Sequence, residues 1–252
     1  MKNISIIILA AGKGTRMNAD MPKVLTQLNN ESLIKNLLKT VNKTEYSDSV
    51  SVVVGYKGEN VIEKLGSEYN FIWQLEQLGT GHAVQQCETS LKNKAENHLI
   101  LYGDVPFISL ETINGAINLH QKEDSVLTMV TLKIKNFEDS NNAYWHFGRV
   151  IRNEKGDILK IVEFRDATDE EKKITEVNPA IYCVKDEWLW ENLAKLKDNN
   201  SQGEYYLTDL VNLAHQQNLK INSFVVENGF EFMGINTKED LELAQKIYKK
   251  KY

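Results

Sequence analysis

A glycine-rich loop with basic residues nearby follows the first apolar run of the chain. The loop reads Leu9, Ala10, Ala11, Gly12, Lys13, Gly14, Thr15 and Arg16. Small residues and glycines let backbone N–H groups approach an anion closely, and Arg16 and Lys23 add positive charge within reach of a phosphate. The spacing fits neither a P-loop nor a dinucleotide fingerprint, because Met17 stands where the latter needs a third glycine. The run predicts a phosphate-binding loop of a different kind, with a tight connecting turn as the alternative.

A glutamine followed by glycines forms a second block. Gln74 precedes Gly79, Thr80 and Gly81. A glutamine side chain donates and accepts hydrogen bonds at once, as recognition of a pyrimidine edge requires. The alternative is a polar turn before a helix that begins near Gly81, with His82 capping or packing. We assign His82 no role, because a histidine at a helix start is more often structural than catalytic.

A carboxylate follows an apolar run in the middle of the chain. Tyr102 ends the run at residues 98–102, and Gly103 and Asp104 come next. Ligands gather at the carboxyl ends of the strands in an open α/β sheet. Mg²⁺ takes one or two protein oxygens and leaves its other positions to water and phosphates. Asp104 is therefore a candidate metal ligand, with a turn residue or a helix N-cap as the alternative.

Short β-rich runs alternate with helical periods over the first two-thirds of the chain, which indicates an α/β fold with a largely parallel sheet. We expect strands at residues 4–10, 49–54, 98–102 and 126–132. Helices are expected at residues 33–41, with Ser32 as the N-cap, and at 61–65 and 112–119.

The rest of the chain has a different pattern. Residues 133–184 hold several short β patterns, which we interpret as a β-rich insertion in a single domain, 1–252. Beyond it the pattern predicts helices at 188–196 and 207–214 and strands at 221–226 and 232–235. A C-terminal helix over 237–252 opens with the capping-box sequence Thr237-Lys238-Glu239-Asp240.

The composition excludes several classes of protein. The chain has 252 residues, of which 42% are hydrophobic, so disorder is disfavoured and one or two domains are expected. Its 35 acidic and 30 basic residues disfavour a general nucleic-acid binder. No run approaches the roughly 20 apolar residues of a membrane span. The 2 cysteines lack the spacing of a disulfide framework or a zinc site, so we expect a reducing, cytoplasmic compartment.

The two loop blocks together resemble the signature of the sugar-1-phosphate nucleotidyltransferases. Within that family the motifs match the uridylyltransferase domain of bifunctional N-acetylglucosamine-1-phosphate uridylyltransferases, over essentially the whole chain. The resemblance implies a Rossmann-like nucleotidyltransferase fold, with a mixed, mostly parallel sheet flanked by helices and a sugar-binding part at residues 133–184. It also implies Mg²⁺-dependent uridylyl transfer from UTP to N-acetylglucosamine-1-phosphate, a step toward cell-wall precursors, with neither nucleic acid nor membrane as partner.

The resemblance assigns roles to individual residues. Arg16, Lys23 and Asp104 would be catalytic, and Asp104 would hold Mg²⁺ together with Asn236, just before the last helix. The nucleotide would contact Leu9, Ala10, Ala11, Gly12, Lys23, Gln74, Gly79, Thr80, Tyr102 and Gly103. The sugar would contact Gly148, Glu163, Asn178, Tyr206 and Thr208.

Three departures from the family pattern fall on the sugar side. Pro179-Ala180 stands where the family usually has Thr-Gly, Phe147 stands where it usually has Tyr, and one extra residue lies between Gly148 and Glu163. Transfer to glucose-1-phosphate or N-acetylmuramate-1-phosphate therefore stays open.

Other activities are less favoured. The block around Gln74 disfavours cytidylyl or thymidylyl transfer, and the intact charged residues disfavour a catalytically silent nucleotide-sugar sensor. Bifunctional family members also carry an acetyltransferase built from hexapeptide repeats. Because the sequence contains no such repeat, we expect no acetyl transfer.

Overall fold

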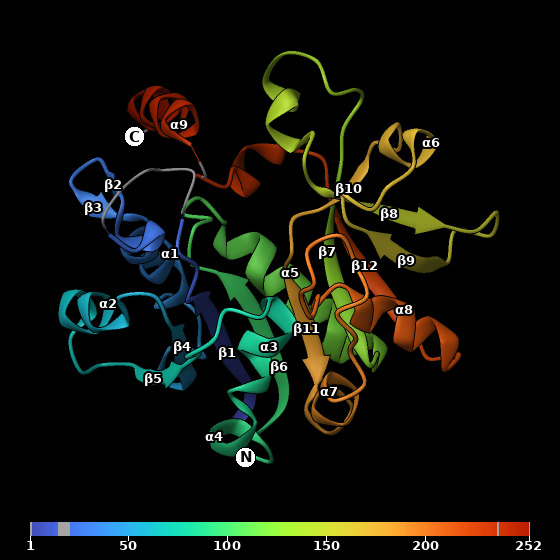
Figure 1. The fold of residues 1–252 in the computed structure, drawn as a ribbon, viewed down its shortest axis with the longest axis horizontal. Helices are drawn as coiled ribbons and strands as arrows, with labels where there is room; N and C mark the ends of the chain where they lie inside the picture. The colour runs from blue at the N-terminus through green and yellow to red at the C-terminus, as the bar shows by residue number, and fades with distance from the viewer. Residues whose placement is uncertain (1, 15–20, 236, 252) are drawn as a thin grey trace.

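One mixed sheet runs through the described part of the chain (Figure 1). The structure is a computed structural model that describes residues 2–14, 21–235 and 237–251. The strand order is β5-β4-β1-β6-β11-β7-β10-β8-β9, with β12 beside β7. The strands are β1 (Lys2–Ala10), β4 (Val50–Val54), β5 (Asn70–Trp73), β6 (Ala95–Tyr102), β7 (Leu127–Lys133), β8 (Gly148–Arg152), β9 (Ile158–Val162), β10 (Glu176–Asn178), β11 (Tyr182–Lys185) and β12 (Ile221–Val226).

Most strands of this sheet run in one direction. β5, β4, β1 and β6 are parallel neighbours. β11 lies antiparallel between β6 and β7, so β7 has the direction of β6, and β12 pairs with β7 in parallel. The fold class implied by the family resemblance is confirmed, as are the strands expected at residues 4–10, 49–54, 98–102 and 126–132.

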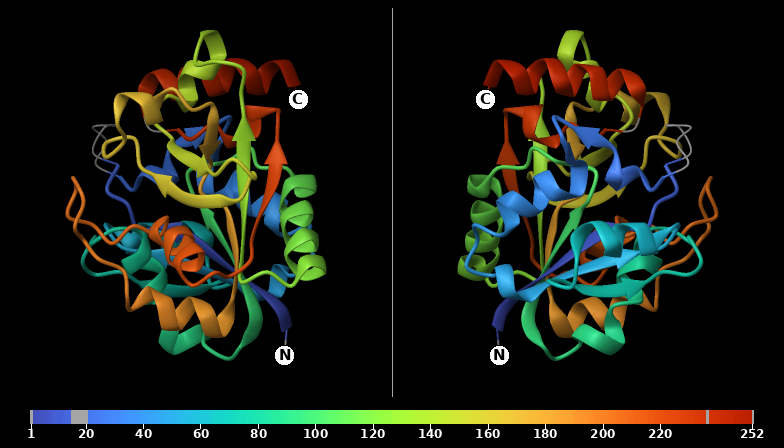
Figure 2. Two further views of the ribbon diagram at one scale, coloured as in Figure 1. Left: turned by 90° about the vertical axis from the view of Figure 1, so that its right-hand side faces the viewer. Right: turned by 90° about the vertical axis from the view of Figure 1, so that its left-hand side faces the viewer.

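Helices cover both faces of the sheet, which gives three layers (Figure 2). One face carries α1 (Leu33–Val41), α2 (Gly58–Leu65) and α5 (Leu110–Glu123). The other carries α3 (Thr80–Gln85), α4 (Glu88–Leu91), α7 (Asp186–Leu193) and α8 (Asp209–Gln216). Side chains alternate along a strand, so Ile6 and Ile8 of β1 enter the first core and Ile7 and Leu9 the second. Burial on both faces explains why β1 is continuously apolar from Ile6 to Ala10.

The register of β1 brings several loops to one edge of the sheet. Leu9 pairs with Tyr102 of β6, and Ala10 pairs with Val54 of β4. The glycine-rich loop and the loop that begins at Gly103 therefore leave the sheet side by side. This is the edge at which the carboxyl ends of parallel strands meet and at which ligands gather.

Strands from the segment 133–184 extend the sheet beyond β7. β10 pairs antiparallel with both β7 and β8, and β8 pairs antiparallel with β9. Figure 1 shows β8 and β9 projecting from the body on the side away from α2. The remaining elements are β2 (Gln27–Leu28), β3 (Glu31–Ser32), α6 (Asp169–Lys172), α9 (Lys238–Lys251) and the 3₁₀ turns η2 (Lys23–Leu25), η3 (Ser47–Ser49), η4 (Asp139–Tyr144) and η5 (Gly229–Phe232).

The C-terminal segment differs from the expectation in one element. The strand predicted at residues 232–235 is wrong, because η5 ends at Phe232 and the following residues make no strand pairing. Phe232, Met233 and Ile235 are nevertheless buried, so burial without a ladder produced the β-like pattern. The capping box of α9 is confirmed: Thr237 N donates to Asp240, and Asp240 N donates to Thr237 Oγ1.

Ser32 occupies the expected N-cap position of α1, but its hydroxyl makes no capping hydrogen bond. Its Oγ is buried without a partner among the described residues. In the described part of the chain no helix has the length and apolarity needed to cross a membrane. Both cysteines, Cys87 and Cys183, are free thiols and buried.

Candidate active site

A cavity of about 260 Å³ lies at the carboxyl ends of β1 and β6. It is lined by nine of the ten residues predicted to contact the nucleotide: Leu9, Ala10, Ala11, Gly12, Lys23, Gln74, Gly79, Thr80 and Tyr102. Asp104, predicted to be catalytic and to hold the metal, lines it as well. Gly103 is outside the lining and holds the loop instead, since its N–H donates to Leu9 O over 2.9 Å. The predicted nucleotide residues therefore converge on one space, although they come from four separate stretches of the chain.

Lys23 and Asp104 form an ion pair in this cavity. The side chains are 14% and 20% exposed, so a ligand that enters the cavity can reach both. Gly14 makes the position of Lys23 possible: its φ is +64°, and an added Cβ would lie 2.6 Å from the Cβ of Lys23. A glycine is thus required here both by the backbone conformation and by the close contact.

The loop that carries Gln74 is joined to a distant segment of the chain. Gly81 N donates to Tyr205 O, Tyr205 N donates to Leu78 O, and both distances are 2.8 Å. Leu207 N donates to the Thr80 hydroxyl over 3.1 Å. These three bonds bring residues 204–208 to the edge of the nucleotide cavity.

A second cavity of about 250 Å³ adjoins the first. Its lining includes all the residues predicted to hold the sugar: Gly148, Glu163, Asn178, Tyr206 and Thr208. Thr80, Tyr102, Asp104 and Glu204 line both cavities. Asp104 therefore lies at the junction, between the group of nucleotide residues and the group of sugar residues.

Several of the sugar-side groups bind one another. Thr208 Oγ1 donates to Glu163 Oε1 over 3.1 Å, and Gln202 Nε2 donates to the Tyr206 hydroxyl over 2.9 Å. Asn178 Oδ1 accepts from Ala180 N, and Asn178 Nδ2 donates to the Tyr182 hydroxyl over 2.6 Å. Asn178 thus fixes its own loop as well as facing the cavity.

Burial raises the pKa of Glu163 above its ordinary value. The nearby carboxylates of Asp209, Asp166 and Glu204 raise that pKa further, while the bond from Thr208 opposes the shift. A buried carboxyl group of this kind can bind a sugar hydroxyl strongly, because it has given up its hydration shell.

The positions of Arg16 and Asn236 lie outside the described residues. The neighbour of Asn236 is described: Ile235 N donates to Asp104 O over 3.2 Å. That bond brings two stretches more than a hundred residues apart in the sequence into contact beside Asp104. Among the described residues no cluster of three or more histidine, cysteine or acidic side chains could hold a metal. In the described part of the site, the carboxylate of Asp104 is the group that could bind a metal ion. One carboxylate suits a hard cation that keeps water or phosphate ligands.

The sequence reasoning missed Glu204 as a site residue. Glu204 lines both cavities, and burial raises its pKa while Arg165 opposes the shift. It lies in the same block as Tyr206 and Thr208, which was the available signal. The residues named above as departing from the family pattern, Phe147, Pro179 and Ala180, all line the sugar-side cavity, as does His146.

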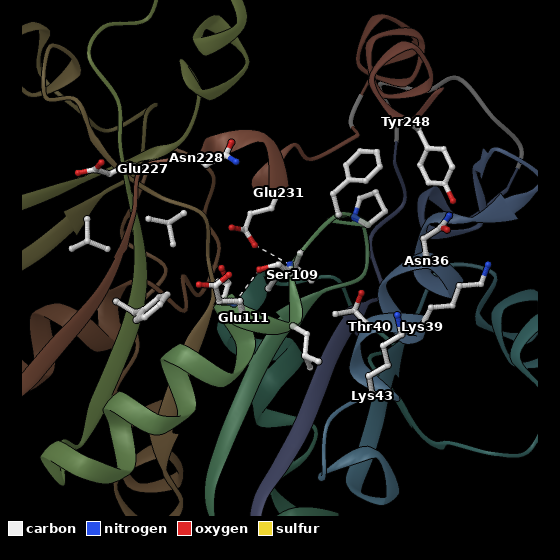
Figure 3. Close-up of a pocket in the computed structure, with 18 residues that line it drawn as sticks. Asn36, Lys39, Thr40, Lys43, Ser109, Glu111, Glu227, Asn228, Glu231 and Tyr248 are labelled. Atoms are coloured by element: carbon white, nitrogen blue, oxygen red, sulfur yellow. Dashed lines mark hydrogen bonds between the residues drawn. The ribbon is translucent and has the colours of Figure 1, made fainter. Parts of the chain in front are cut away.

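A larger cavity, about 890 Å³, lies elsewhere between α1, the start of α5 and α9 (Figure 3). Its charged groups are mixed, with Lys39 and Lys43 on one wall and three glutamates facing them. Glu231 accepts a hydrogen bond from Ser109 N over 2.8 Å, so a carboxylate of the chain already binds at the start of α5. Of the predicted site residues that the structure describes, none lines this cavity.

Comparison with known proteins identifies the family of this chain. A family model described as the MobA-like NTP transferase domain matches residues 6–208. The chain belongs to this family. The transferase domain is 38% identical over 249 residues to the bifunctional protein GlmU of Clostridioides difficile (strain 630). The match covers 99% of this chain and 52% of the relative. It is 36% identical over 251 residues to the bifunctional protein GlmU of Brevibacillus brevis, covering 100% of this chain and 53% of the relative.

The transferase domain thus spans about half the length of the curated relatives it matches. Solved structures share its fold at lower identity. UDP-glucose pyrophosphorylase complexed with UDP-glucose superposes with a TM-score of 0.73 at 16% identity, over 100% of both chains. CMP:2-keto-3-deoxy-manno-octonic acid synthetase complexed with CTP gives 0.71 at 15% identity, again over 100% of both chains. The family resemblance found from the motifs is confirmed.

Proposed function

We propose that this domain transfers a uridylyl group from UTP to N-acetylglucosamine-1-phosphate, which yields UDP-N-acetylglucosamine and pyrophosphate. The observation that carries the proposal is the position of Asp104 at the junction of the two cavities. The identity to GlmU proteins along nearly the whole chain supports the same reaction, because uridylyl transfer is the activity that the motif resemblance implies.

The proposed reaction needs no protein nucleophile. An oxygen of the sugar phosphate attacks the α-phosphorus of UTP, a new P–O bond forms, and the bond to the β-phosphate oxygen breaks as pyrophosphate leaves. Since the attacking group is already an anion, the work left to the protein is to position two anions and to offset their charge. Lys23 lines the nucleotide cavity beside Asp104 and would neutralise the α-phosphate. Arg16, which lies outside the described residues, would act on the leaving pyrophosphate.

Asp104, together with Asn236, would hold Mg²⁺, which supplies positive charge opposite the phosphate oxygens of the two substrates. Backbone N–H groups of the loop at Ala11 and Gly12 would bind the nucleotide phosphates, and Gln74 and Gly79 would face the uracil. On the other side, Glu163, Asn178 and Thr208 would bind the sugar hydroxyls and the acetamido group.

The decisive experiment is a measurement of pyrophosphate release with UTP, Mg²⁺ and N-acetylglucosamine-1-phosphate. Asp104→Ala should lower kcat/KM by about 10²–10³, the usual cost of removing one charge-stabilising group. Asp169→Ala, which removes a 96% exposed carboxylate from α6, is the matched control and should retain the wild-type rate. Turnover of Asp104→Ala close to wild type would remove Asp104 from the reaction.

A second candidate keeps the reaction and changes the sugar to glucose-1-phosphate or N-acetylmuramate-1-phosphate. It is favoured by one observation: the residues that depart from the family pattern line the cavity assigned to the sugar. The same assay with the three sugar phosphates separates the candidates by their kcat/KM values. Absence of pyrophosphate release with all three would contradict both.

A further inference from the structure

Within the described part of the chain, hydrogen bonds reach the side-chain amide of Gln74 at its nitrogen and not at its oxygen. Gln74 is 3% exposed and lines the nucleotide cavity. Its Nε2 donates to Gly79 O over 3.0 Å and lies 3.1 Å from Nδ1 of His82. An amide nitrogen carries two hydrogens, so these contacts use both of them within the protein. Among the described residues no donor reaches Oε1, and an acceptor is what the side chain has left for a ligand.

The orientation of this amide is fixed by its neighbours. Rotation by 180° would place Oε1 against the carbonyl of Gly79, and two acceptors would face each other. The carbonyl cannot change its role, so Nε2 stays on that side and Nδ1 of His82 must accept its second hydrogen. In the neutral ring the proton is then on Nε2, which lies 3.0 Å from Nε2 of Gln86. That amide nitrogen is itself a donor and also donates to His82 O over 3.3 Å, so the amide of Gln86 must turn by 180° for its oxygen to accept this proton.

His82 is not among the residues that line the cavity, so it acts through Gln74. We propose that His82 is a positioning residue that makes the base site select uracil over cytosine. The inference rests on the proposed function, in which Gln74 faces the base of the nucleotide. Uracil presents an N3–H donor at that edge, which Oε1 accepts. Cytosine presents an N3 acceptor instead, which Oε1 repels. His82, as the second acceptor beside the carbonyl of Gly79, adds to the cost of turning the amide to offer N–H.

The contact separates uracil from cytosine but not uracil from thymine, because thymine has the same N3–H donor. UTP and CTP are therefore the informative pair, and dTTP is the internal control. We expect wild-type protein to prefer UTP to CTP by at least about a hundredfold, since a site built around a hydrogen bond rejects a ligand that lacks the partner group.

Two substitutions at residue 82 separate the role of Nδ1 from that of the ring as a whole. In His82→Asn the shorter amide places an oxygen near the position of Nδ1 and can still accept from Gln74. In His82→Gln the longer amide reaches the position of Nε2 and leaves Gln74 without its second acceptor. Both variants keep a polar side chain at the start of α3, and thermal unfolding checks that both are folded.

The test is calorimetric titration of UTP, CTP and dTTP, alongside kcat/KM for pyrophosphate release. We expect His82→Gln to narrow the UTP-to-CTP ratio by about tenfold, the effect of one neutral hydrogen bond, and His82→Asn to keep it within about twofold. In ¹⁵N spectra of wild-type protein, Nδ1 of His82 should be unprotonated and Nε2 protonated.

The outcomes distinguish the two levels of the proposal. If UTP binds tightly and the ratio is the same in wild type and His82→Gln, or if Nδ1 carries the proton, the role of His82 is overturned and the proposed function stands. If wild-type protein binds none of the three pyrimidine nucleotides, both the proposed function and this inference are overturned. If UTP binds but no sugar phosphate is turned over, only the proposed reaction fails.

Discussion

Ala180 has a φ of 62°, a left-handed conformation that a residue with a Cβ adopts at a cost of about 1 kcal/mol. Its N–H is held there by Asn178 Oδ1 over 3.0 Å, in a loop that lines the sugar-side cavity. The related family pattern has a glycine at this place, which adopts the same conformation freely. The departure noted from the sequence is therefore a site of backbone strain.

We predict that Ala180→Gly raises the free energy of unfolding by about 1 kcal/mol, because it relieves this strain. Urea denaturation with an unchanged slope measures the effect. Ala214→Gly, in the interior of α8, makes the same chemical change in a right-handed conformation and should lower stability instead. A loss of stability in Ala180→Gly would contradict the prediction.

Glu163 gives a pH-dependent prediction. Because burial and neighbouring carboxylates raise its pKa, the folded protein holds this proton to a higher pH than the unfolded chain does. The free energy of unfolding therefore falls as pH rises from the pKa of Glu163 in the unfolded chain, about 4.3, toward its higher pKa in the folded protein. Glu163→Gln removes that dependence and keeps an acceptor for Thr208.

We expect Glu163→Gln to match wild type in free energy of unfolding at low pH and to exceed it at neutral pH. Denaturation curves at a series of pH values measure the difference between the two proteins, which cancels the titration of other groups. Asp209→Asn, at a neighbouring carboxylate whose pKa is also raised by burial, should show a change of the same sign. A difference that stays constant with pH would show that Glu163 titrates normally in the folded protein.

Single residues could be predicted where their chemistry is visible in a local motif. Gln74, Lys23 and Asp104 stand in recognisable runs, and the structure brings them to one cavity. The role of His82 could not be predicted, because it depends on which nitrogen faces Gln74 after the loop has closed. The sequence contains both residues but not the 3.1 Å contact between them.

At the scale of elements, the loop of Gln74 and the segment 204–208 behave as one unit. Gly79 lies at their contact, with a φ of +108°, and an added Cβ would lie 2.7 Å from the carbonyl oxygen of Tyr205. Gly66 also has a positive φ, +78°, but an added Cβ there meets nothing within 4 Å. The two glycines form a matched pair, because only one of them touches another backbone.

We predict that Gly79→Ala separates the two segments and weakens UTP binding by at least about tenfold, whereas Gly66→Ala leaves binding unchanged. Both substitutions should lower stability by about 1 kcal/mol through backbone strain. Calorimetric titration of UTP against the two variants measures the difference. Equal UTP affinity in the two variants would mean that the contact with Tyr205 does not shape the nucleotide site.

The existence of the main strands and helices could be predicted, because their apolar periods are local. Their neighbours could not: nothing in residues 182–185 shows that β11 enters between β6 and β7. The strand predicted at residues 232–235 was wrong because its apolar pattern has another cause. Its apolar residues are buried by packing under α9 and against the sheet, and a short apolar run does not reveal whether it is also hydrogen-bonded to a strand.

At the scale of the whole molecule, both sides of the site belong to one sheet. The nucleotide residues follow β1, β5 and β6, the sugar residues lie on or near β8 to β10, and β11 and β7 join the two groups. We therefore propose that residues 1–252 behave as one domain and predict a single unfolding transition, with equal calorimetric and van't Hoff enthalpies. Two resolved transitions would contradict this.

UTP should stabilise this whole unit. At a concentration one hundred times its Kd, the nucleotide should raise the free energy of unfolding by about 2.7 kcal/mol. ATP, which lacks the pyrimidine edge, serves as the control. Stabilisation of one part of the chain without the other, seen by hydrogen exchange, would show that the two sides of the site are uncoupled.

The place of β11 in the sheet also bears on how the chain is made by the ribosome. β6 is complete at Tyr102 and β7 at Lys133, yet the strand between them begins only at Tyr182. For the roughly 4–16 s of synthesis between Tyr102 and Tyr182, at about 5–20 residues per second, β6 lacks a neighbour on one side. Unpaired apolar edges of this kind adhere to other chains. We therefore expect the nascent chain to bind, during that interval, a chaperone that shields strand edges.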